Sequence, residues 1–139
     1  MFTLFNASDI FLVTTTPTQI LSLLHIISDI AFERIDPQGN FIVIENAGSI
    51  GKDQDMTNWS IRRKIDSKDY IVYKFPDNFV LQSRSRVYVL SGIGRKSSFV
   101  HREALVADNI PTWDTGTNMC TRLLDANGDE KALFNQKYK

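Results

Sequence analysis

Apolar and polar residues alternate along short runs over most of this chain. The clearest run is centred on Trp59, where Trp59 and Ile61 alternate with Ser60, Arg62 and Lys64. Successive side chains of a β-strand point to opposite faces, so a period of two predicts an extended segment. This segment therefore has one apolar face and one basic face.

Further runs rich in β-branched and aromatic residues continue the pattern. The expected strands cover residues 30–36, 41–45, 59–64, 70–75, 79–81, 86–90, 119–124 and 131–134, with one or two more in 100–107. Residues 92–98 are expected to form a loop, and the Asn127-Gly128 pair predicts a tight hairpin. Eight or nine short strands, spaced by roughly 8–12 residues without helices between them, predict an all-β sandwich of immunoglobulin type.

The N-terminal residues follow a different pattern. In the segment 16–19, Thr16 can cap a helix, Pro17 suits the first helical position and a glutamine completes a capping box. Ile20, Leu24 and Ile27 then recur at helical spacing. These features predict a short amphipathic helix, of roughly 12 residues, ahead of the sandwich.

The change of pattern near residue 30 divides the chain. We expect an N-terminal extension over residues 1–29, a β-sandwich domain over 30–135 and a C-terminal tail over 136–139. The apolar stretch at the N-terminus is interrupted by polar residues, and no run of about 18 apolar residues is available to span a membrane.

The charges balance overall but are unevenly distributed. The 139 residues contain 16 basic and 16 acidic residues, whereas a chain dedicated to non-specific nucleic-acid binding is usually strongly basic. Residues 50–105 hold eleven Lys and Arg against six Asp and Glu. This basic middle indicates either a local patch for an acidic partner or a solvated sheet face.

Few residues suggest chemistry. No nucleophile with a nearby base, phosphate-binding loop or paired carboxylates occurs at a suitable spacing, so we expect no catalytic residues, no bound metal and no cofactor. The single cysteine, Cys120, is expected to be a small buried hydrophobe. Phe41, Trp59, Phe75 and Trp113 are expected to anchor the core.

Several segments together resemble one family. The matching segments, in order, are GNFIVIEN (39–46), MTNWSIRR (56–63), YKFP (73–76), FVL (79–81), Trp113 with Gly116, and NGDE (127–130). Over residues 30–134 the chain resembles the lamin tail domain, an immunoglobulin-like module of intermediate-filament proteins. The resemblance is closer to invertebrate cytoplasmic filament proteins than to vertebrate lamins, which tend to end in a prenylated cysteine box; residues 136–139 contain no cysteine.

The resemblance implies a non-catalytic structural module that binds partner proteins, possibly intermediate-filament proteins, and so helps to organise the cytoskeleton or the nuclear lamina. Lys74 stands where the family has a surface basic residue. The partner-binding residues are therefore expected to be Arg62, Lys64, Lys74, Arg84 and Arg86. The alternative is a nucleic-acid or chromatin-binding module that uses the same basic residues.

The resemblance also sets expectations for the whole protein. A cytoplasmic, cytoskeletal location is expected, with the nucleus as the alternative. No long coiled-coil rod precedes the domain in residues 1–29, so the chain is expected to be a fragment, a rodless relative or an alternative product. The oligomeric state is left open.

Overall fold

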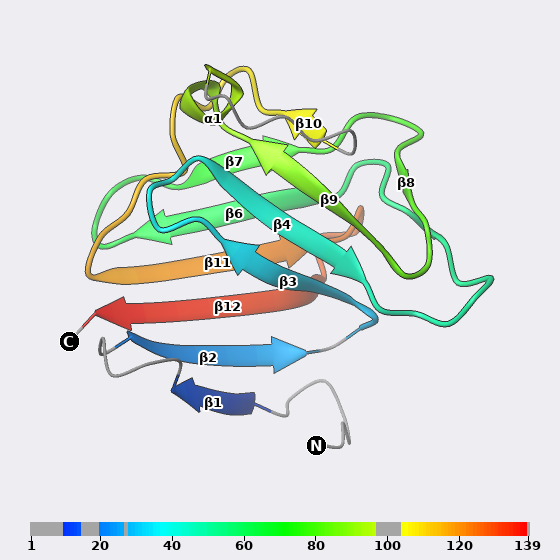
Figure 1. Ribbon diagram of the computed structural model, residues 1–139, viewed down its shortest axis with the longest axis horizontal. Helices are drawn as coiled ribbons and strands as arrows, with labels where there is room; N and C mark the ends of the chain where they lie inside the picture. The colour runs from blue at the N-terminus through cyan, green and yellow to red at the C-terminus, as the bar shows by residue number, and fades with distance from the viewer. Residues whose placement is uncertain (1–9, 15–19, 27, 97–103, 139) are drawn as a thin grey trace.

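The computed structural model describes residues 10–14, 20–26, 28–96 and 104–138, and in these residues two β-sheets face each other as a sandwich (Figure 1). The larger sheet has six strands in the order β1-β2-β12-β11-β6-β7. These strands are β1 (Ile10–Thr14), β2 (Ile20–Ile26), β12 (Glu130–Tyr138), β11 (Asn118–Leu124), β6 (Ser60–Ile65) and β7 (Ile71–Lys74).

The smaller sheet has four strands in the order β10-β9-β4-β3, and a separate pair is formed by β5 and β8. These strands are β10 (Ala104–Val106), β9 (Ser85–Leu90), β4 (Phe41–Asn46), β3 (Ile30–Ile35), β5 (Gln54–Asp55) and β8 (Val80–Leu81). The all-β sandwich predicted from the sequence is confirmed, although the described residues form twelve strands rather than eight or nine.

Alternating side chains build the core between the two sheets. On β6, Ile61 is buried while Arg62 is exposed, and on β4 the inward residues Ile42 and Ile44 are buried as well. The principal core cluster also contains Trp59, Phe75 and Trp113. Phe41 lies in a second buried cluster with Val43, Tyr88 and Leu90, which are the alternate residues of β4 and β9. Since β4 is buried on both faces, its sequence is almost continuously apolar.

Trp113 connects the two sheets through its side chain and its backbone. The indole Nε1–H donates a hydrogen bond to the backbone oxygen of Val89 on β9 (2.9 Å). The backbone oxygen of Trp113 accepts a hydrogen bond from Nε of Arg63 on β6 (2.8 Å). Trp113 is fully buried, so neither bond competes with bulk water.

The predicted N-terminal helix is wrong. Residues Ile20–Ile26 form β2, which pairs antiparallel with β1 on one side and with β12 on the other. The predicted helix start at 16–19 lies outside the described residues. The apolar residues of β2 fit a period of two as well as a helical one, and a short apolar run does not distinguish the two. The long edge of β12 supplies backbone partners for a strand, and this tertiary pairing decides the outcome.

The predicted loop at 92–98 is also wrong in part, because Gly92–Lys96 form a short helix, α1. Ser91 explains where it begins: its Oγ accepts a hydrogen bond from the backbone N–H of Gly94 (3.1 Å), which is N-terminal capping. A Cβ at Gly94 would clash with the backbone of Asn40, so glycine allows α1 to lie against the start of β4. In the described residues, no helix is long and apolar enough to cross a membrane.

Tyr73 gives the fold a specific response to alkaline pH. Burial, with a smaller contribution from the charge of Asp108, raises the pKa of Tyr73 from 10.0 to about 12. Between these values the unfolded chain loses a proton that the folded chain keeps, so the wild type loses stability as pH rises. Tyr73→Phe should remove about 1–3 kcal/mol of that loss between roughly pH 10 and pH 12, measured by urea denaturation.

The comparison of the two chains isolates Tyr73 from other groups that titrate in this range. Arg63 is one such group, and its lowered pKa of about 10 acts in the opposite direction. The contributions of Arg63 and of the other titrating residues are the same in the wild type and in Tyr73→Phe, so they cancel in the comparison. Parallel stability curves above pH 10 would show that Tyr73 does not have the raised pKa.

Candidate functional site

The outer face of the large sheet collects basic side chains from three neighbouring strands. On β6, Arg62 is exposed and Lys64 half-buried, and both point away from the core. The register places Arg62 opposite Val72 on β7 and opposite Arg122 on β11. Lys74 at the end of β7 is exposed opposite Ser60. We define Arg62, Lys64, Lys74, Arg122 and Tyr70 as the basic face.

Tyr70 gives this face an aromatic centre. Its ring lies beneath two cations, with Cζ of Arg62 at 4.8 Å and Nζ of Lys64 at 5.1 Å from the ring centroid. Nearly half of the Tyr70 side chain remains exposed (47 %), so the ring is available to a partner as well. Cation–π contacts at exposed sites contribute roughly 0.5–1 kcal/mol each, enough to favour one arrangement of two long side chains.

Arg122 extends the basic face to β11. Its Nε lies 3.6 Å from Oε1 of Glu130 on β12. The interaction with Cys120, two residues earlier on the same strand, and the charge of Glu130 raise the pKa of Arg122. Cys120 is half-buried and directly opposite Lys64, so the expected small buried hydrophobe is instead a residue of the outer face.

The structure separates the predicted partner-binding residues into two groups. Arg62, Lys64 and Lys74 lie together on the outer face of the large sheet. Arg84 lies in the turn before β9, with a positive φ of 58°, and Arg86 lies on β9 in the smaller sheet. Nη1 of Arg86 is 3.2 Å from Oε2 of Glu33 on β3, so its charge is partly compensated there. These two arginines do not belong to the basic face.

Two members of the basic face were not identified from the sequence. Arg122 alternates with buried Leu123 and Thr121, so the period of β11 already placed it outward. Its position next to Arg62, however, depends on the pairing of β11 with β6, which are separated by more than fifty residues. The sequence pattern places Tyr70 only at the start of a strand, and its stacking beneath Arg62 depends on the turn between β6 and β7.

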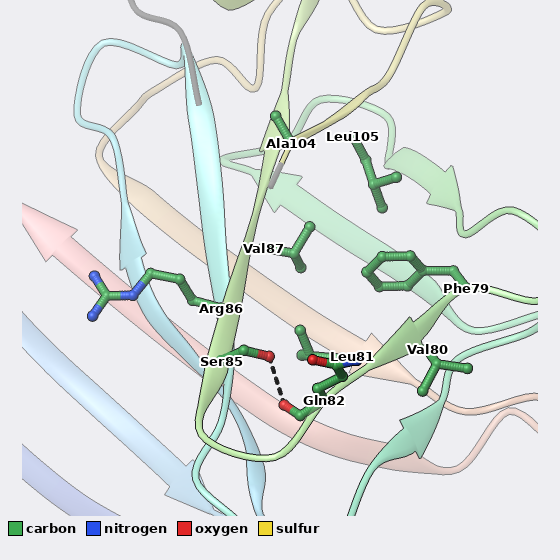
Figure 2. A pocket seen from close by; sticks show the side chains of 9 residues that line it. All are labelled: Phe79, Val80, Leu81, Gln82, Ser85, Arg86, Val87, Ala104 and Leu105. Atoms are coloured by element: carbon green, nitrogen blue, oxygen red, sulfur yellow. Dashed lines mark hydrogen bonds between the residues drawn. The ribbon is translucent and has the colours of Figure 1, made fainter. Parts of the chain in front are cut away.

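A second feature is an apolar cavity of about 360 Å³ between β8 and the start of β9 (Figure 2). Phe79, Leu81, Val87 and Leu105 surround it, whereas the Arg86 side chain points away (Figure 2). The hydroxyl of Ser85 at its edge donates to the backbone oxygen of Gln82 (2.6 Å). The lining residues therefore present hydrocarbon rather than an acid–base pair.

Metal ligands do not gather in the part of the chain that the structure describes. No group of three or more His, Cys, Asp or Glu side chains lies close enough there to hold an ion. The carboxylate of Asp125 instead closes the β11–β12 hairpin, since Oδ1 accepts hydrogen bonds from the backbone N–H groups of Asn127 and Asp129 (both 2.9 Å). Asp125 thus has a structural role in the hairpin turn.

Comparison with known proteins places the fold and its sequence in one family. The family model described as "Lamin Tail Domain" matches residues 26–137. Intermediate filament protein B of Ascaris suum is 32% identical over 111 residues, which cover 78% of this chain and 18% of that protein. Intermediate filament protein ifb-1 of Caenorhabditis elegans is 32% identical over the same shares of the two chains.

A third relative, intermediate filament protein ifb-2 of Caenorhabditis elegans, is 31% identical over 111 residues, or 78% of this chain and 20% of that protein. The chain thus spans about a fifth of the length of these curated relatives. The predicted resemblance to lamin tail domains of invertebrate filament proteins is confirmed.

Proposed function

Since the chain belongs to the lamin tail domain family, we propose that it works as a docking module of intermediate-filament type, whose basic face binds acidic partner proteins. The lamin tail domain is a structural module and not a catalytic family. The observation that carries the proposal is the grouping of Arg62, Lys64 and Lys74 on one outer face. Among the described residues, none of these three forms an ion pair with a carboxylate.

An acidic protein surface suits this face better than a nucleic acid does. The predicted basic patch is divided between the two sheets, and the chain carries no net positive charge. Nucleic-acid binding depends on many phosphate contacts, whereas a compact group of cations around one aromatic ring suits a short acidic segment with apolar residues.

For the location of the module we propose the cytoplasmic cytoskeleton, because its relatives are intermediate filament proteins. A tagged chain found at the nuclear rim would overturn that location.

The charge requirement can be tested with paired variants. Arg62→Glu combined with Lys74→Glu reverses two exposed charges of the basic face, and Arg84→Glu combined with Lys96→Glu makes the same change elsewhere. The first pair should weaken binding of a labelled poly-glutamate peptide by at least about tenfold, and the control pair should change it by less than about twofold. Fluorescence anisotropy at physiological salt measures both, and a random DNA duplex is the competing probe.

Equal loss of affinity in both pairs would show that net charge, and not the basic face, controls binding. Tighter binding to the DNA duplex than to poly-glutamate, with a steep dependence on salt, would support the nucleic-acid alternative instead. All four substituted side chains are exposed, so each variant should keep the fold. Thermal denaturation of each variant checks this.

A further inference from the structure

β7 forms an edge of the large sheet. Its only strand neighbour among the described residues is β6. The register of the pair continues to Trp59 and Phe75, where the backbone N–H of Phe75 donates to the oxygen of Trp59 (2.9 Å). Hydrogen-bonded pairs alternate along antiparallel strands, so Tyr73 also directs its backbone groups at β6. Val72 and Lys74 therefore direct their backbone N–H and C=O groups away from β6, toward the edge with which no described strand pairs.

Two large apolar side chains are exposed along this edge. Val72 is 44 % exposed and Tyr70 is 47 % exposed, and the two follow the same edge. Side chains of a strand added beside β7 would alternate between the basic outer face and the side of the core. Residues on the outer face would lie next to Val72 and Lys74, with Arg62 one strand further in.

The two edges of the smaller sheet are less suited to strand addition than β7 is. β3, at the edge of the smaller sheet, has a register shift between Phe32 and Arg34 and carries Glu33 and Arg34 with opposite charges. Bulges and mixed charges are features that protect edges from pairing. β10, at the other edge of that sheet, has three residues in the described part of the chain. β7 combines regular register with exposed apolar side chains.

Charge determines which strand can pair with β7. A second copy of this chain would bring another β7, and with it another Lys74 and Arg62, next to the first basic face. Like charges on facing strands destabilise a sheet, so self-pairing is disfavoured. An acidic strand has the complementary charge: a Glu or Asp would lie beside Lys74 and an apolar residue beside Val72.

We infer that β7 receives an extended acidic segment of a partner protein as a seventh strand of the large sheet. On the outer face of that segment, acidic residues alternate with apolar residues. This inference rests on the proposed function, since it specifies how the basic face engages its partner. Backbone hydrogen bonds to Val72 and Lys74 would supply the affinity, and Tyr70, Arg62 and Lys74 would select acidic sequences.

Amide hydrogen exchange distinguishes strand addition from attraction between charges alone. The probe is a short peptide in which Glu and Val alternate at the outward-facing positions and Thr fills the positions between them. Free chain should exchange the amides of Val72 and Lys74 rapidly and that of Tyr73 slowly, because only the latter faces β6. Bound peptide should slow exchange at Val72 and Lys74 by at least about tenfold.

Two further changes, one in the peptide and one in the chain, test the backbone hydrogen bonds directly. Methylating alternate amides of the peptide should abolish binding for one set of positions and leave it nearly unchanged for the other, since only alternate residues face the edge. In the chain, Val72→Pro removes an outward N–H that the β6–β7 ladder does not use, and proline is tolerated at such edge positions. Val72→Ala is the control for the lost side chain.

Binding without protection of Val72 and Lys74, or equal sensitivity to both sets of methylated amides, would overturn strand addition while leaving docking on the basic face intact. Failure of the unmodified peptide to bind would overturn both. The methylated peptides act on the wild-type chain, so this test holds even where Val72→Pro fails to fold.

Discussion

Replacing Trp113 with phenylalanine is expected to lower the free energy of unfolding by about 2–3 kcal/mol, and replacing it with alanine by about 4 kcal/mol or more. Trp113 is fully buried, and its ring meets that of Tyr73 edge-on, with centroids 6.4 Å apart. Phenylalanine would leave part of the space empty and the backbone oxygen of Val89 without its donor. A buried acceptor without a partner retains the full penalty of its desolvation.

Trp59→Phe is the matched control for the hydrogen bond. Trp59 is buried in the same core cluster, and its indole N–H has no hydrogen-bond partner among the described residues. Both changes remove the same atoms, so the extra loss at Trp113 reports the bond to Val89. Chemical denaturation followed by circular dichroism measures both. Equal losses at the two tryptophans would show that the bond between the sheets contributes nothing beyond packing.

The strands of the sandwich could be predicted because burial repeats along them with a period of two. β6 shows this best, since Ile61 and Ile65 are buried and Arg62 is exposed. The N-terminal residues could not be assigned in the same way. Ile20–Ile26 fit either period, and their state is decided by β12, which comes more than a hundred residues later. Backbone pairing over that separation leaves no local signal in the sequence.

The candidate site was predictable within one hairpin and not beyond it. Arg62 and Lys74 are brought together by β6 and β7, which are neighbours in the sequence. Arg86 belongs to a strand of similar appearance, but β9 pairs with β4 in the other sheet. Arg122 joins the basic face from the C-terminal hairpin. The alternation assigns a residue to one face of its strand, whereas the topology determines which strands share a sheet.

Arg63 shows the same limit within a single strand. Alternation places it on the face of Ile61, which implies burial for a residue type that is almost never buried without partners. Those partners come from distant segments: its guanidinium donates to the backbone oxygens of Trp113 (2.8 Å) and Asp114 (3.1 Å) and to Oγ1 of Thr121 (2.6 Å). Burial lowers the pKa of Arg63 to about 10, and the charge of Asp114 opposes that change. The side chain is therefore still charged at neutral pH.

Arg63→Lys is expected to lower the free energy of unfolding by about 2–4 kcal/mol, although it conserves the charge. A lysine ammonium has no planar fork, so it cannot reach the backbone oxygens of Trp113 and Asp114 and the hydroxyl of Thr121 together. It would leave buried acceptors unpaired and a buried charge with fewer hydrogen bonds. Arg62→Lys, one residue earlier and exposed on the opposite face, should change stability by less than about 0.5 kcal/mol.

Arg63→Met separates the hydrogen bonds from the volume of the side chain. Methionine fills part of the same space without a charge, and replacing buried ionic groups with apolar ones is sometimes neutral. In this chain the acceptors belong to the backbone of the segment that carries Trp113, and they would stay buried after the substitution. Arg63→Met should therefore destabilise the fold by a similar amount to Arg63→Lys. Wild-type stability in Arg63→Met would mean that the guanidinium is tolerated in the core rather than required to hold the Trp113 segment against β6.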